Sequence, residues 1–180
     1  HRRAGTWELV PAASCRSGRK PVGSTWAFDV KRNADGTISR YKARLCAQGF
    51  SQIEGWDFNI TYSNTIRLDT VRLLLAIAAM KKLKLTGIDI VTAYLNGTLE
   101  EVIHMRQPPG FEEQGSNGEP MVCRLVKSIY GLKQSGKCWE TRLLAELKKI
   151  GFCRCDYDAC LFRMTAEAEI IYIGVYVDDL

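Results

Sequence analysis

The chain has 180 residues, of which 46% are hydrophobic, 25% charged and 9% aromatic. This composition is typical of a folded globular domain and excludes a disordered segment. No stretch approaches the roughly 20 apolar residues of a membrane span, and the start lacks the apolar run of a signal peptide. We therefore expect a soluble, intracellular protein that does not contact a membrane. Because the first residue is His1 rather than Met, we also expect a piece of something longer.

Charge and cysteine content narrow the range of functions further. Residues 1–50 hold ten Lys/Arg and three Asp/Glu, a balance of +7, whereas residues 51–180 hold fifteen and seventeen, a balance of −2. A basic front is expected of a surface that meets nucleic-acid phosphates, although a solvated basic face explains the charge equally well. The seven cysteines include no CxxC pair, which favours free thiols in a reducing compartment over a zinc site.

In the first half of the chain, the patterns predict a β-rich lobe, a helix and a short strand. Within the lobe, "STWAFDVKR" and "ISRYKARLCAQ" form two antiparallel strands over residues 24–48, joined by the turn "NADG". The segment "IRLDTVRLLLAIAAMKK" predicts a helix whose apolar face has three-and-four spacing. That face comprises Leu68, Val71, Leu74, Leu75 and Ala78. A short strand through Asp89 and a helical turn ending near Asn96 follow.

In the second half, a long loop precedes a short strand around Met121–Leu125. The segment "SGKCWETRLLAELKKIG" predicts a second helix, with Gly151 as its cap. Its apolar face comprises Trp139, Leu143, Leu147 and Ile150. "ACLFRM" and "IIYIGVYV" predict paired strands with "TAEAE" as their turn. The body is therefore expected to be α+β, with helices packed on an antiparallel sheet.

Three aspartates are the candidate catalytic residues. Asp178 and Asp179 follow a run of β-forming residues, and Asp89 lies in the apolar segment "TGIDIV", where an unpaired charge would be costly. If a tight turn begins at Asp178, both neighbouring carboxylates can reach one cleft, and such a pair is stable when a cation lies between them. Oxygen ligands suit Mg²⁺, and two such ions can support phosphoryl transfer. Taken singly, each aspartate is explained as well by a solvated turn or a strand end.

Nearly the whole chain, from about Thr6 to Leu180, resembles the reverse transcriptase of copia-type retrotransposons. The resemblance rests on "TWELVP", "KRNADGTISRYKARLCAQGFSQ", "RLLLAIAA", "DIVTAYLNGTLEE", "QPPGF", "SIYGLKQS", "DACLF" and "YVDDL", in that order. It implies a right-hand polymerase arrangement, with residues 6–85 mainly in a β-rich fingers lobe and the first helix, and residues 86–180 mostly in the palm. The sequence departs from the usual pattern at Asn64 and at Gly136–Cys138, which we interpret as relaxed constraint.

The resemblance also implies roles for individual residues. Asp89, Asp178 and Asp179 match the catalytic, metal-binding aspartates, and the main-chain carbonyl of Ile90 matches an auxiliary metal ligand. The remaining matches concern the incoming nucleotide. Tyr94 would lie under its sugar and exclude a 2′-hydroxyl, Gln134 would contact it, and Lys42 and Arg44 would meet its triphosphate. Core packing explains Tyr94 alone, and ordinary surface or helix positions explain the other three.

The implied function is RNA-directed DNA polymerisation, in which deoxynucleotides are added to a primer 3′-end with two Mg²⁺ ions, for which Mn²⁺ can substitute. The implied partners are an RNA or DNA template-primer, dNTPs and the rest of the Pol polyprotein, with integrase upstream and the thumb and RNase H downstream. The implied location is a cytoplasmic virus-like particle or the nucleus. The alternatives are a non-catalytic nucleic-acid-binding remnant and a different two-metal palm enzyme such as a nucleotide cyclase. Because the strand that returns after "YVDD" and the thumb are not in the chain, we expect Asp178 and Asp179 to be frayed and the chain alone to be inactive.

Overall fold

The computed structural model describes residue 1 and residues 4–15, 18–166 and 169–180. Its strands form three antiparallel sheets, ordered β1-β5-β4, β2-β3 and β6-β7-β8. The elements are β1 (Trp7–Pro11), η2 (Ala12–Ser14), β2 (Ser24–Arg32), β3 (Ile38–Ala47), η3 (Gly49–Ser51), α1 (Leu68–Lys81), η4 (Ala93–Asn96), β4 (His104–Met105), β5 (Met121–Leu125), α2 (Ser135–Lys149), β6 (Cys153–Arg154), β7 (Leu161–Ala166) and β8 (Glu169–Gly174). The expected mixture of helices and antiparallel strands is confirmed, but the strands are divided among small sheets.

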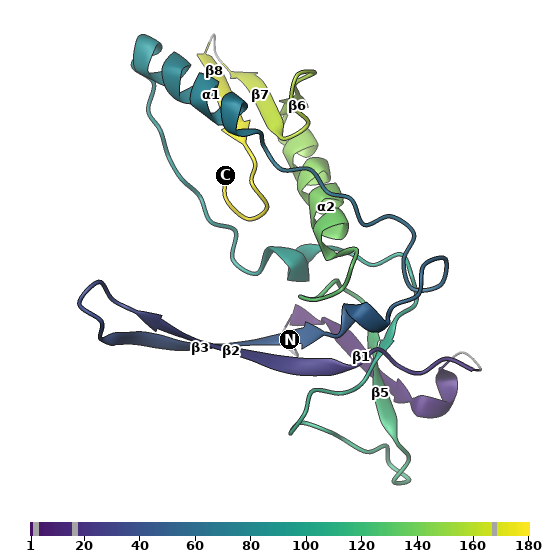
Figure 1. Ribbon diagram of the computed structural model, residues 1–180. Coiled ribbons are helices and arrows are strands. Elements are labelled where there is room, and N and C mark those ends of the chain that lie inside the picture. The colour runs from purple at the N-terminus through teal and green to yellow at the C-terminus, as the bar shows by residue number, and fades with distance from the viewer. Residues whose placement is uncertain (2–3, 16–17, 167–168) are drawn as a thin grey trace.

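The basic segment forms the predicted hairpin. β2 and β3 pair from Ser24↔Ala47 to Arg32↔Ile38, and the turn between them is closed by a hydrogen bond from the Asn33 amide to the Thr37 carbonyl at 2.9 Å. Figure 1 shows the hairpin as a long ribbon that extends away from both helices. Paired residues share a face of the ribbon, so one face carries most of the charge. The pairs on that face are Ala27↔Arg44, Asp29↔Lys42 and Lys31↔Arg40.

Helix α1 lies beside β8 at one end of the molecule (Figure 1). It ends at Lys81, and the capping residue Lys82 has a left-handed φ of 52° and an amide that donates to two carbonyls of the last turn. The predicted apolar face is only partly covered. Ala78 is buried, whereas the side chains of Leu68 and Leu75 are 64% and 49% exposed. The expected burial of those two leucines is therefore wrong, because α1 packs over only one part of its apolar stripe.

Helix α2 is the better packed of the two helices. Trp139, Leu143 and Leu147 are buried as predicted, but Ile150 is 63% exposed because the helix has already ended. Gly151 has a φ of 97°, and the next amide, of Phe152, donates to the Leu147 carbonyl at 2.9 Å. This is the expected glycine cap. Its buried side chains pack in one cluster with Phe162 of β7 and with Val175, and Figure 1 shows the helix running up to the β6-β7-β8 sheet.

Strands β7 and β8 pair in the predicted order, from Leu161↔Gly174 to Ala166↔Glu169. The pairing runs further than the sequence indicated. Thr165, Ala166 and Glu169, which were expected in the turn, belong to the strands. The rest of the expected turn, residues 167–168, lies outside the described residues.

The buried apolar side chains form two clusters. One joins the β1-β5-β4 sheet to the base of the ribbon and includes Leu45, Met105 and Cys123. The other lies between α2 and the β6-β7-β8 sheet and includes Trp139, Phe162 and Val175. The second cluster supports the segment that carries Asp178 and Asp179. Among the described residues, no helix is long and apolar enough to cross a membrane.

Candidate active site

Asp89 and Asp179 lie directly opposite each other as an antiparallel pair. Ile88 and Leu180 exchange two backbone hydrogen bonds of 2.9 and 2.8 Å, and the Ile90 amide donates to the Asp178 carbonyl at 2.8 Å. Between these bonded positions, Asp89↔Asp179 is a non-hydrogen-bonded pair, the kind in which Cα atoms approach to about 4.5 Å and side chains share a face. The expectation that the aspartates are frayed is therefore wrong for the backbone.

Asp89 was expected to lie within an apolar strand, where an unpaired charge would be costly, and the structure corrects this expectation. Residues 86–90 form this bridge rather than a regular strand, and the Asp89 side chain is exposed rather than surrounded by apolar groups. Its charge therefore carries no burial penalty that a cation would need to relieve. What distinguishes Asp89 is its position opposite Asp179, and the sequence pattern alone gave no information about that pairing.

A stack of side chains joins Tyr94 to the ribbon. Tyr94, on η4, meets the ring of Tyr130 edge to face, with centroids 5.0 Å apart and planes at 74°. The guanidinium carbon of Arg44 lies over the same Tyr130 ring, 5.9 Å from its centroid. Such contacts are favourable in themselves. They bring two residues that the resemblance assigned to the nucleotide, Tyr94 and Arg44, to one aromatic neighbour that the sequence analysis missed.

Tyr94 also connects this stack to the aspartates. Burial raises the pKa of Tyr94, and the negative charge of Asp178 raises it further. Asp178 therefore lies within electrostatic reach of the phenol. The backbone at Tyr94 is held by the Ser128 hydroxyl, which donates to the Tyr94 carbonyl. Contacts therefore join Arg44, Tyr130 and Tyr94, and the charge of Asp178 acts on the Tyr94 phenol.

Lys42 and Ile90 are the other two residues to which the resemblance gives a role near these groups. Lys42 lies two residues further out along β3 than Arg44, on the same face, and is half-buried. Ile90 is bound through its amide to the Asp178 carbonyl at 2.8 Å, and its side chain packs against the α2 cluster. The phosphate contact of Lys42 and the ligand role of the Ile90 carbonyl both stay predictions.

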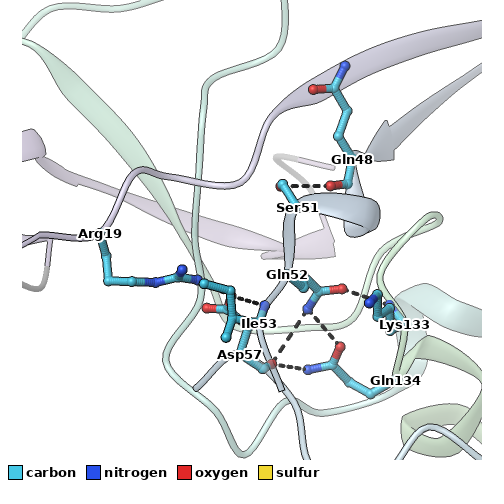
Figure 2. A network of polar contacts seen from close by, with 8 residues as sticks. All are labelled: Arg19, Gln48, Ser51, Gln52, Ile53, Asp57, Lys133 and Gln134. Carbon is cyan, nitrogen blue, oxygen red and sulfur yellow. Dashed lines mark hydrogen bonds and ion pairs between the residues drawn. The ribbon is translucent and has the colours of Figure 1, made fainter. Parts of the chain in front are cut away.

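Gln134 lies in the interior rather than on an open surface. Its side chain is 2% exposed. Its amide group donates to the Asp57 carbonyl at 2.7 Å, and its oxygen accepts a 3.0 Å hydrogen bond from Gln52. Figure 2 shows Gln52 between Gln134 and the Lys133 amide, to which its own oxygen is bound at 2.8 Å. The Asp57 carboxylate in turn pairs with Arg19.

This network connects three segments that are distant in sequence: residue 19, residues 52–57 and the start of α2 (Figure 2). A direct contact between Gln134 and a nucleotide would require these hydrogen bonds to open. In the described conformation the side chain therefore stabilises the junction between these segments, and its nucleotide contact stays a prediction.

The chemistry of the site suits a divalent cation, and its geometry provides part of what such an ion needs. Two carboxylates, those of Asp89 and Asp179, project from one face, and hard oxygen ligands are those that Mg²⁺ prefers. Within the described residues, no three Asp, Glu, His or Cys side chains are gathered closely enough to hold a metal ion. Asp178, which sits in the turn, is the carboxylate that has not joined the pair.

The comparisons with known proteins identify the family of the chain. Residues 4–180 match the family described as reverse transcriptase (RNA-dependent DNA polymerase). The chain belongs to the reverse transcriptase family. Members of this family generally use divalent metal ions. No solved structure matches the chain.

The similar proteins are transposon polyproteins. The chain is 39% identical over 175 residues to the retrovirus-related Pol polyprotein from transposon RE2 of Arabidopsis thaliana, covering 97% of the chain and 12% of the relative. It is 37% identical over 177 residues to that from transposon TNT 1-94 of Nicotiana tabacum, covering 98% and 13%. The Ty1-LR2 Gag-Pol polyprotein of Saccharomyces cerevisiae is 32% identical over 163 residues, covering 90% and 8%. The chain is therefore a part of a copia-type Pol and spans about an eighth of the plant relatives it matches.

Proposed function

We propose that this part of the polyprotein carries the nucleotidyl-transfer site of the reverse transcriptase. The observation that carries the proposal is the pairing of Asp89 with Asp179, next to the line of Tyr94, Tyr130 and Arg44. These acidic groups, this aromatic surface and this cation are the chemical groups that would bind a deoxynucleotide with its triphosphate, which supports the proposal. In this proposal the ribbon β2–β3 is the fingers element, and residues 86–180 supply most of the palm.

In this site each residue would have a separate task. Arg44 and Lys42 would bind phosphate oxygens, since guanidinium offers paired donors and ammonium a point charge. Tyr94, held between Tyr130 and the aspartate segment, would lie against the sugar and leave no room for a 2′-hydroxyl. The primer 3′-hydroxyl would attack the α-phosphorus, and pyrophosphate would leave. The protein's contribution is mainly position and charge.

Asp89 and Asp179 would hold the two Mg²⁺ or Mn²⁺ ions, with Asp178 and the Ile90 carbonyl as further ligands. When bound, these ions would neutralise phosphate charge and favour ionisation of the 3′-hydroxyl. Since Asp178 stands apart from the other two carboxylates, we propose that it joins them when the substrate binds. The implied partners are a template-primer, dNTPs and the flanking parts of Pol.

Primer extension tests this proposal. Residues 1–180 would replace the matching segment of the Nicotiana tabacum relative, and dTMP incorporation on an RNA template would be measured with Mg²⁺. We expect incorporation by the chimera, loss of at least a hundredfold in Asp179→Asn, and no change in the control Asp156→Asn, because Asp156 is exposed on another segment.

The same experiment decides the alternative of a non-catalytic remnant. The observation in its favour is that the described residues do not gather three carboxylates, while the ribbon presents a basic face. Salt-sensitive RNA binding by the chimera without any incorporation would support the remnant and contradict the proposed activity.

A further inference from the structure

The turn that carries Asp178 has an unusual backbone. Tyr176 and Asp179 exchange two backbone hydrogen bonds, of 2.8 and 3.0 Å, which close a two-residue turn made of Val177 and Asp178. Val177 has a φ of 58°. This left-handed conformation is common for glycine but is strained for a β-branched side chain. Something outside the turn must therefore stabilise it.

Trp139 makes the contact that stabilises the turn. Its indole Nε1 donates a hydrogen bond of 2.6 Å to the carbonyl oxygen of Val177. The indole belongs to α2 and is 6% exposed, within the cluster that contains Phe162 and Val175. Because the ring is fixed by this packing, it is a rigid donor rather than a mobile surface side chain. An indole can only donate, so a carbonyl is the partner it requires.

The carbonyl that Trp139 holds is part of the peptide between Val177 and Asp178. A peptide group is planar, so fixing the direction of its oxygen also fixes the direction of the Asp178 amide and Cα. It thereby limits ψ of Val177 and φ of Asp178 to the values that the turn needs. A hydrogen bond 38 residues away in sequence thus restrains the backbone immediately before both carboxylates.

We propose that Trp139 is a positioning residue for Asp178 and Asp179. It holds Val177 in its left-handed conformation and so keeps the following residues on the strand that pairs with Asp89. Trp139 does not touch a reacting atom in this role and acts through the backbone alone. That the carboxylates bind metal rests on the proposed function, but the positioning of the turn does not.

The test compares Trp139→Phe with a matched control. Phe keeps the aromatic volume and removes the donor. Trp26→Phe is the control, because the Trp26 indole also donates to a backbone carbonyl, that of Pro109 at 3.0 Å, on the ribbon. Amide hydrogen exchange of the 180-residue chain would be measured residue by residue. In Trp139→Phe we expect exchange about tenfold faster at Ile90 and Asp179, and in Trp26→Phe no change at either amide.

Two further measurements distinguish positioning of the turn by Trp139 from a general loss of core packing. Val177→Gly removes the strain of the left-handed φ, so in the Trp139→Phe background it should recover most of the lost protection. Protection of the β7–β8 amides should stay within about twofold of the wild type. Equal exchange in the two single variants at Ile90 and Asp179, faster exchange throughout β6–β8, or no recovery with Val177→Gly would each overturn the proposal.

Mn²⁺ titration, followed by electron paramagnetic resonance, separates this inference from the proposed function. If the site binds metal, Trp139→Phe should weaken Mn²⁺ binding about tenfold, and Asp179→Asn should abolish it. If the wild type binds no Mn²⁺, the proposed metal site fails, while the exchange measurements still decide the role of Trp139. Should Trp139→Phe not fold, the wild-type indole protons give the answer. The Trp139 indole should exchange at least tenfold more slowly than that of Trp26, and equal rates would overturn the proposal.

Discussion

Asp158→Asn tests how the start of α1 is attached to the rest of the chain. Asp158 is 3% exposed, and its carboxylate accepts three hydrogen bonds. One oxygen receives the Arg67 amide at 3.0 Å and the Thr70 hydroxyl at 2.7 Å, and the other receives the Cys160 amide at 2.8 Å. Asparagine offers one oxygen, so its NH₂ group must face at least one of these donors. A buried donor without an acceptor costs about 1–3 kcal/mol, and the lost charge-assisted bonds add to this. We expect unfolding free energy at pH 7 to fall by about 2–4 kcal/mol.

The effect should depend on pH in a defined direction. Burial by itself would raise the pKa of Asp158, but the hydrogen bonds from Arg67, Cys160 and Thr70 outweigh it, so the pKa lies below its ordinary value of 3.8. A carboxyl group with a lowered folded-state pKa stabilises the protein above its unfolded-state pKa, and that stability is lost as pH falls. The difference between wild type and Asp158→Asn should therefore be largest at pH 7 and shrink below about pH 4.

Urea unfolding followed by tryptophan fluorescence at pH 7 and pH 3 measures both quantities. Asp156→Asn is the matched control, because Asp156 lies two residues earlier and is exposed, and its effect should stay within about 0.5 kcal/mol. A difference below about 0.5 kcal/mol for Asp158→Asn at pH 7 would refute the reasoning, as would a difference that is constant between the two pH values.

Two further predictions concern close packing and thiol reactivity. Gly131→Ala should destabilise the chain by about 3 kcal/mol or more in urea unfolding, because a Cβ at this φ of 89° would overlap the Ala47 carbonyl oxygen. The control Gly110→Ala has a similar φ of 82° but open space around the Cβ, so it should cost only about 1 kcal/mol. With Ellman's reagent at pH 8, the exposed thiol of Cys153 should react in the native chain. The Cys123 thiol should react only after unfolding, because burial raises its pKa to about 12. Equal reaction rates of the two thiols would contradict this prediction.

The sequence predicted the local elements well, because their signals are local. The turn "NADG", the helical spacing in α1 and α2 and the alternation in β7 and β8 each depend on neighbouring residues, and each element is present. Periodicity shows which side of a helix is apolar but not how much of that side is covered. Leu75 is exposed for that reason, because the surface that would cover it depends on the packing of distant segments. Ile150 is exposed because α2 ends before it.

The residues that seemed irregular in the sequence have partners that only the fold shows. Asn64, which departs from the family pattern, donates a 2.6 Å hydrogen bond to Glu140. Lys137, another departure, pairs with the same carboxylate at 3.0 Å. Burial would raise the pKa of Glu140, but the hydrogen bonds from Asn64 and Lys137 outweigh it, so the pKa is lowered. These two departures therefore share one partner, Glu140, although they lie 73 residues apart in sequence.

The position of the aspartates follows the same logic. The expectation of frayed carboxylates assumed that only a strand after the turn could hold them. In a sequence, a hairpin is recognised by two strands on either side of a turn, so a missing second strand suggested a loose end. In the structure, residues 178–180 are held on one side by residues 88–90 and on the other by Tyr176. The segment of Asp179 therefore lies between two others, that of Asp89 and that of Tyr176. Both of these precede the turn in sequence. The backbone bonds that hold the Asp89–Asp179 pair come from residues 88–90, 176 and 178–180. In the proposed function, substrate binding would bring Asp178 to the pair, and the Trp139 indole restrains the backbone just before it.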